Sequence, residues 1–154
     1  MSERELRDCF GLFATGVMIA STNYKDELYG MTINSFASVS LKPPMLLFSI
    51  GNESYNLRFF KKTKYFSLNT LSVNQLPLAR EFARHQNQHK WAMEEFYLTK
   101  LKNPVFNHSL GFFECKKHKL IKAGDHHILI GEIVDFAKLN NAKPLTYINS
   151  QFCI

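Results

Sequence analysis

The chain has 154 residues, of which 45% are hydrophobic, so its length and composition predict one globular domain spanning residues 1–154. Lys and Arg number 19 against 13 acidic residues, which gives a formal net charge of +6. The basic residues are scattered, and their densest runs, at 59–64 and 115–119, are too short for a basic tail. We therefore expect neither a nucleic-acid nor a membrane partner.

Cysteine use and the N-terminal residues point to the cytoplasm. Cys9, Cys115 and Cys153 are odd in number and form no C-x-x-C pair, which argues against a secreted disulfide framework. The first ten residues are charged, unlike a signal peptide, and no apolar run approaches the ~20 residues that span a bilayer. We expect a cytoplasmic protein with reduced thiols.

Helix and strand signals alternate along the first half of the chain. Ser2 and Glu5 form a capping-box pattern that predicts a helix from about residue 3 to residue 14. The nearly continuous apolar run 45–50 predicts a strand buried on both faces. We also predict a hairpin of strands 17–22 and 28–36 with a longer loop, and a short helix, capped by Ser54, that ends near residue 61.

The second half continues in the same way. Residues 64–71 alternate as a strand does, and Ser72 with Gln75 forms a second capping box that opens a helix to about residue 84. The pattern weakens over 85–108, where we predict loop and a short helix containing Trp91, Met93 and Phe96. The last predicted strands are 112–121, 127–139 and 144–148.

The predicted strands outnumber the predicted helices and come mainly as hairpins. A mainly β fold, with a closed or nearly closed antiparallel barrel and peripheral helices, fits this order best. The sequence has no internal repeat and no evident linker, which agrees with a single domain.

The stretch from residue 30 to residue 40 carries an unusual set of polar side chains. If it forms one strand, its short polar residues share one face: Thr32, Asn34, Ser38 and Ser40. Exposed strand faces usually carry Lys, Glu, Arg or Gln, whereas every polar residue here is short. Short donors and acceptors let a planar ligand approach the backbone, and an ordinary solvated face is the alternative.

Signals for phosphate, metal and hydrolytic sites are weaker. Glycine-rich nucleotide loops are absent from the sequence, but the helix start at 52–56 offers backbone N–H groups to an anion, unless it is an ordinary cap. His85 and His89 are spaced to share a helix face, yet they have no further ligand at metal-site spacing. We predict no metal site, and no nucleophile motif supports hydrolysis.

The segment GDHHILIGEI, residues 124–133, begins an apolar strand with an acid and an imidazole. Two interpretations stay open. Asp125 either bonds its own backbone in a turn or orients His126 at the rim of a pocket.

Taken in order, these segments resemble the flavin reductase-like family, which has the FMN-binding split-barrel fold and includes reductase components of two-component flavin monooxygenases. The resemblance rests on FATGVMIAST (13–22), GMTINSFASVSLKPPMLLFSI (30–50), FSLNTLSVNQLPLAREFA (66–83), GDHHILIGEI (124–133) and PLTYI (144–148). It implies an antiparallel Greek-key split β-barrel with peripheral helices. It also implies a homodimeric NAD(P)H-dependent flavin reductase that binds FMN or FAD and supplies reduced flavin to a monooxygenase component.

The resemblance also assigns roles to individual residues. His126 is the implied catalytic residue and, together with Tyr147, the implied contact for NADH or NADPH. The implied flavin contacts are Thr32, Asn34, Ser35, Ser38, Val39, Ser40, Ser49, Ile50, Gly51, Ser54, Asn56, Phe82, Ala83 and Lys90. Among these, Ser54 and Asn56 would meet the ribityl phosphate.

The C-terminal segment departs from the family pattern, because Ser150 stands where Gly is expected and Phe152 where Tyr is common. A positive φ at Ser150 would be unfavourable for serine. Two other functions stay open. One is an FMN-binding electron-transfer flavoprotein that does not release reduced flavin, and the other is a non-flavin binding module that uses the basic surface. The choice between FMN and FAD, and between NADH and NADPH, also stays open.

Overall fold

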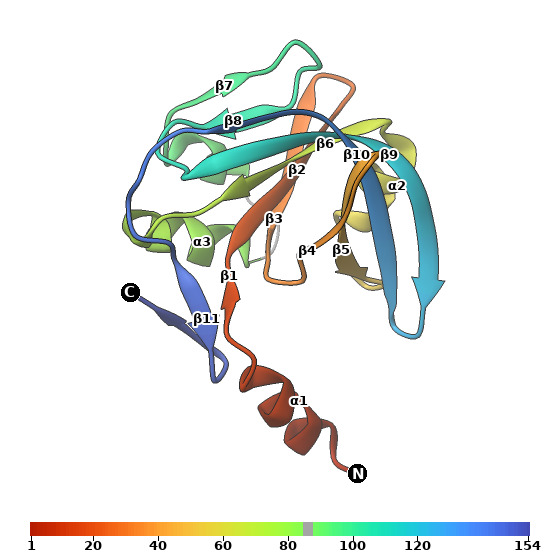
Figure 1. Cartoon of the computed structure of the whole chain (residues 1–154), viewed down its shortest axis with the longest axis vertical. Helices are drawn as coiled ribbons and strands as arrows, with labels where there is room; N and C mark the ends of the chain where they lie inside the picture. The colour runs from red at the N-terminus through yellow and green to blue at the C-terminus, as the bar shows by residue number, and fades with distance from the viewer. Residues whose placement is uncertain (85–87) are drawn as a thin grey trace.

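The computed structural model describes residues 1–84 and 88–154 and consists mainly of antiparallel strands (Figure 1). The helical elements are α1 (Glu3–Gly11), α2 (Leu57–Lys62), η1 (Val73–Gln75), α3 (Leu76–Phe82) and η2 (Gln88–Ala92), of which η1 and η2 are 3₁₀ turns. The strands are β1 (Thr15–Gly16), β2 (Met18–Tyr24), β3 (Glu27–Ile33), β4 (Ala37–Leu41), β5 (Pro44–Gly51), β6 (Tyr65–Thr70), β7 (Phe96–Leu98), β8 (Pro104–Phe106), β9 (Gly111–Ala123), β10 (His126–Lys138), β11 (Thr146–Ile148) and β12 (Gln151–Cys153).

A seven-stranded sheet in the order β3-β2-β6-β9-β10-β5-β4 forms the body of the molecule. Its two edge strands, β3 and β4, follow each other in sequence and are joined only by residues 34–36. The chain from Ile33 to Ala37 spans at most about 14 Å when extended, so the two edge strands must lie close together and the sheet must curl. Because β3 and β4 are not hydrogen-bonded neighbours, the barrel stays split at this seam, and the predicted fold is confirmed.

Two apolar cores stabilise the barrel. The first fills its interior, where Phe48, Phe60 and Phe66 make edge-on ring contacts. The second lies beside α3 and η2 and contains Phe82 and Trp91, whose rings meet edge to face. Strand β2 contributes alternate residues to the two cores and is therefore buried on both faces.

The prediction that 45–50 would be buried on both faces is wrong. In β5, Leu46, Phe48 and Ile50 point into the core, while the residues between them are half-buried. The reason is placement in the sheet, since α3 packs against β2 and β3. The sequence identified a strand here but not which strand the helices would cover.

Local chemistry explains where the predicted boundaries change. The β2–β3 hairpin has a two-residue turn, Lys25 and Asp26, with φ of 55° and 63°, in place of the predicted longer loop. Strand β12 was not predicted, and Phe96 lies in β7 rather than in a helix. Helix α2 starts at Leu57 with Asn56 as its N-cap residue, not Ser54.

Helix α1 projects away from the barrel beside the chain start (Figure 1). The predicted capping box is confirmed: Glu5 N–H donates to Ser2 Oγ at 3.2 Å, and Ser2 N–H donates to Glu5 Oε2 at 3.1 Å. The helix ends at Gly11, earlier than predicted, and none of its residues is buried. None of the helices within 1–84 and 88–154 combines the length and the hydropathy needed to cross a bilayer.

Candidate functional site

The polar stretch 30–40 lies at the split of the barrel and is not one strand. Strand β3 ends at Ile33 and β4 begins at Ala37, so the residues between them cross from one edge to the other. Ser35 ties this crossing to β5, because its Oγ accepts from Ser49 N–H at 2.9 Å and lies 3.2 Å from the Ser49 carbonyl oxygen. Both serines were predicted to contact flavin, and here they hold the crossing in place.

A β-bulge further divides the predicted polar face. Ser38 pairs with Leu46 and Ser40 with Met45, so Val39 is the extra residue of β4. Leu46 and Met45 are consecutive in β5, so their side chains point to opposite faces of the sheet. Their partners, Ser38 and Ser40, therefore also point to opposite faces. The prediction that the short polar residues share a single face is therefore wrong.

Four predicted residues nevertheless meet around a cavity of about 180 Å³ beside the split. The cavity is lined by Val17, Thr32, Ile33, Asn34, Ala83, Tyr147 and Phe152. Thr32 Oγ1 donates to the Ala79 carbonyl at 2.6 Å, which holds β3 against α3. The rings of Tyr147 and Phe152 meet at 67° with centroids 5.2 Å apart and form an aromatic wall.

A second cavity of about 450 Å³ shares Asn34 with the first. Its lining residues are Phe13, Thr15, Gly16, Met18, Asn34, Phe36, Thr70 and Phe113. Within the described part of the chain, the buried Thr15 Oγ1 has no hydrogen-bond partner. Buried polar atoms are almost always hydrogen-bonded, so this hydroxyl is available to bond a polar atom of a ligand.

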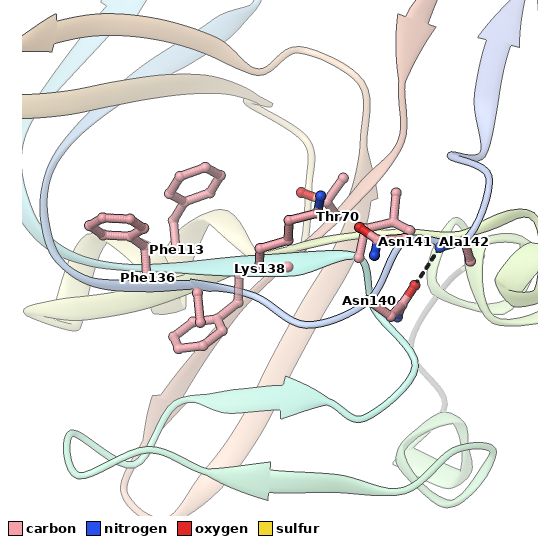
Figure 2. A pocket seen from close by; sticks show the side chains of 11 residues that line it. Thr70, Phe113, Phe136, Lys138, Asn140, Asn141 and Ala142 are labelled. Carbon is pink, nitrogen blue, oxygen red and sulfur yellow. Dashed lines mark hydrogen bonds between the residues drawn. The ribbon is translucent and has the colours of Figure 1, made fainter.

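A third cavity, of about 410 Å³, shares Thr70 and Phe113 with the second (Figure 2). It runs past Phe136 and Lys138 to a loop in which Asn140 Oδ1 accepts from Ala142 N–H at 2.8 Å. None of the predicted site residues is among those that line it. The second cavity thus shares lining residues with each of the other two, and four of the predicted residues meet at the first.

His126 opens β10 and pairs with Gly51, the last residue of β5. Its Nδ1 lies 2.7 Å from Asp125 Oδ1, and this hydrogen bond holds the pKa of Asp125 below its usual range. His126 Nε2 lies 3.8 Å from where a Cβ on Gly51 would be, so the ring lies over bare backbone. The Asp125–His126 contact is present, but His126 is not among the residues that line the three cavities above, so its place at the rim of a pocket stays a prediction.

The predicted phosphate residues lie just beyond this point. Ser54 N–H donates to the Gly51 carbonyl at 3.0 Å, which turns the chain back, and Ser54 Oγ accepts from Asn56 N–H at 3.3 Å. Asn56 is buried at the start of α2, and its side chain makes no capping hydrogen bond. The Asn56 amide is therefore not used to cap its own helix.

Three predicted flavin contacts have side chains packed in the cores instead. Ile50 and Phe82 are almost fully buried. Lys90 is also buried: its Nζ donates to the Gly30 carbonyl at 2.8 Å and lies 4.6 Å from the Phe82 ring centroid. Burial lowers the pKa of the Lys90 ammonium. A direct contact from these side chains stays a prediction and requires local repacking.

The C-terminal departure from the family pattern leaves the cavity intact. Asn149 and Ser150 form the β11–β12 turn with φ of 50° and 59°, and Asn149 N–H donates to the Gly11 carbonyl at 2.7 Å. Ser150 therefore adopts the left-handed conformation that favours glycine, at a cost of about 1 kcal/mol. The turn returns Phe152 to Tyr147 at the cavity.

The sequence did not identify every residue at this site. Thr15 was given no role, Val17 was predicted only as the start of a strand, and Asn52 was assigned to a turn and a possible anion-binding helix start, yet Asn52 contacts the β9–β10 hairpin. The place of Thr15 and Val17 in the resembling motif 13–22 was the signal available for those two residues, and Asn52 lies outside the motifs. Among residues 1–84 and 88–154, no group of three His, Cys, Asp or Glu side chains is arranged to hold a metal, and His85 lies outside the described residues.

A family model described as "Flavin reductase like domain" matches residues 10–154. The chain belongs to this family. Among solved structures, this chain is similar to an NADH:FAD oxidoreductase of Streptomyces globisporus in complex with NAD and FAD fragments. That structure has a TM-score of 0.94 and 28% identity, and the alignment covers 99% of this chain and 92% of the other.

Two curated relatives carry the comparison further. The reductase component of the flavin-dependent trigonelline monooxygenase of Acinetobacter baylyi is 40% identical in an alignment of 138 residues that covers 86% of this chain but 43% of the relative. The FMN reductase (NADH) SmoA of Agrobacterium fabrum is 32% identical over 151 residues, 98% of this chain and 85% of the relative. This flavin reductase-like chain thus spans less than half of the first relative and most of the second.

The residues at the split fit a flavin. The cavities there combine aromatic and apolar walls with a few polar groups, as sites for planar heteroaromatic ligands do. Asn34 belongs to both nearest cavities, and the unpaired Thr15 hydroxyl offers a donor and an acceptor.

Proposed function

We propose that the protein is an NAD(P)H:flavin oxidoreductase that binds FMN or FAD and transfers hydride to it from a reduced nicotinamide. The observation that carries the proposal is the placement of His126. Asp125 holds the imidazole over the bare backbone of Gly51, one turn away from Ser54. Family membership over residues 10–154 supports the same activity.

When bound, the flavin supplies the hydride acceptor, and the protein supplies binding and orientation. With Nδ1–H donated to Asp125, Nε2 of His126 is left to contact the nicotinamide or the flavin edge. Ser35 fixes the crossing between β3 and β4, which holds Asn34 at the cavity wall. Tyr147 provides an aromatic surface on the nicotinamide side of the site.

An absorbance titration with FMN and FAD, followed by NADH and NADPH oxidation under air, tests this proposal. The reductase is expected to be colourless when purified and to oxidise reduced nicotinamide only when flavin is added. A yellow protein that keeps its flavin would support the electron-transfer flavoprotein instead. Absence of flavin binding, together with salt-dependent nucleic-acid binding, would support the basic binding module.

The phosphate assignment predicts a selective loss of FMN affinity. Ser54→Ala is expected to weaken FMN binding roughly tenfold, because a hydrogen bond to a charged group is lost. Asn56→Asp is expected to weaken it further through repulsion of the phosphate. Riboflavin, which lacks the phosphate, is the matched control ligand in the same titration. Equal FMN affinities for both variants and the unaltered protein would remove the assignment.

We further propose that the protein forms a homodimer through its exposed apolar residues in and just after α1. Phe10 and Phe13 are 68% and 79% exposed, and a nine-residue helix without buried contacts has little stability of its own. Phe13 also lines the second cavity, so a partner subunit there would lie beside the flavin site. Sedimentation equilibrium should give twice the chain mass of 17.9 kDa, and Phe10→Ser should shift the protein towards the single-chain mass. A monomeric unaltered protein would contradict the proposal.

A monooxygenase component is the proposed acceptor of the reduced flavin. The relative from Acinetobacter baylyi is itself a reductase component of such a system, which supports this partner. A cytoplasmic location remains a prediction, supported by the need of the reaction for reduced nicotinamide.

A further inference from the structure

Asn52 follows β5 directly and contacts the β9–β10 turn on both sides of His126. Its backbone N–H donates to the Asp125 carbonyl at 2.8 Å. Its side-chain Nδ2 donates to the Gly124 carbonyl at 3.2 Å, and its Oδ1 lies 2.7 Å from Nδ1 of His127. Asn52 therefore holds both the turn that precedes His126 and the imidazole ring of His127, which follows it.

This contact lies where the hairpin leaves the sheet: β10 pairs with β5 as far as His126 and Gly51, and the turn at Gly124 and Asp125 lies beyond that pairing. Strand β9 pairs with β6 only over residues 111–116, so its last residues have β10 as their one sheet neighbour. The turn contains Gly124, with φ of 58°, and Asp125, whose side chain is 94% exposed. Because Asp125 is this exposed, its hydrogen bond can hold the His126 ring only as firmly as the turn itself is held.

We propose that Asn52 is a positioning residue for the reaction: its side-chain amide holds the β9–β10 turn against the end of β5, and thereby sets His126 over Gly51. The inference rests on the proposed function of His126, because the hydrogen bonds of Asn52 reach the residues on either side of His126.

The two ends of the Asn52 side-chain amide are not interchangeable, because one donates and the other accepts hydrogen bonds. Nδ2 is the only donor of the side chain and faces a carbonyl oxygen, so Oδ1 must face His127. The Nδ1–H of His127 therefore donates to Oδ1. Asn52→Asp would keep the acceptor for His127 but would place a carboxylate oxygen against the Gly124 carbonyl. Asn52→Ala would remove both side-chain bonds and leave the backbone bond to Asp125 in place.

A double-mutant cycle distinguishes positioning from a general structural role. Asn52→Ala is expected to lower kcat/KM for NADH about tenfold, since small misplacements of a reacting group are costly. Because Asn52 acts through His126, the double variant Asn52→Ala/His126→Ala should be no worse than His126→Ala alone. Asn52→Asp should fall between Asn52→Ala and the unaltered protein. Asn74→Ala, an exposed asparagine in η1, is the matched control and should keep full activity.

Hydrogen exchange tests the contact independently of activity. Asn52→Ala should speed amide exchange at residues 124–127 by about tenfold and leave exchange in β2 and β6 unchanged. Unchanged amide exchange at residues 124–127 in Asn52→Ala would overturn the inference. So would a kcat/KM of the double variant that falls by the product of the two single losses. If the unaltered protein reduces no flavin, the proposed function fails, and the exchange result alone decides whether Asn52 holds the turn.

Discussion

Replacing His126 by Ala is expected to lower kcat/KM for reduced nicotinamide by roughly 10- to 100-fold, the loss that follows removal of one hydrogen bond to a charged group. The ring is placed for this role because Asp125 accepts from Nδ1 and Gly51 offers no side chain beneath it. Stopped-flow reduction of flavin by NADH and NADPH measures the effect directly. Flavin affinity, determined by titration, shows whether the ring contacts the nicotinamide or the flavin edge.

A histidine elsewhere on the same hairpin provides the control. His118 lies in β9 and is exposed, so His118→Ala should retain the rate of the unaltered protein. Full rate and full affinity in His126→Ala would show that the assigned role is wrong. A loss of similar size in both variants would point to damage to the hairpin rather than to the site.

Gly131→Ala is expected to destabilise the fold by about 2–3 kcal/mol, because the barrel interior has no room for a methyl group there. A Cβ at Gly131 would lie 2.5 Å from Cζ of Phe66 and 2.9 Å from Cβ of Cys115. Phe66 cannot easily move, since its ring already contacts Phe48 and Phe60 in the buried core. Urea unfolding followed by circular dichroism measures the change in free energy.

Gly16→Ala is the matched control for this substitution. A Cβ at Gly16 meets no atom within 4 Å, so the free energy of unfolding should change by less than about 0.5 kcal/mol. Equal stability of the Gly131 variant and the control would mean that the core accommodates the methyl group, contrary to the packing described.

Part of the candidate site was predictable because short-range chemistry marks it. Glycine and aspartate mark the turn that precedes His126, and the predicted Asp125–His126 contact is present at 2.7 Å. Thr32, Asn34, Ala83 and Tyr147 also meet at one cavity. Ile50, Phe82 and Lys90 do not line it, because motif positions do not say which side chains the cores will bury.

By itself the sequence determined the elements whose ends are set by neighbouring residues. The capping boxes at Ser2 and Ser72 and the long hairpin of β9 and β10 are present as predicted, since a capping box depends on residues three positions apart and the hairpin starts from a short turn. Only the tertiary structure decided how the sheet curls, where β4 bulges, and that Asn52 meets His127 across 75 positions. Such contacts depend on which strands become neighbours and in what register, and register arises from the packing of the whole barrel.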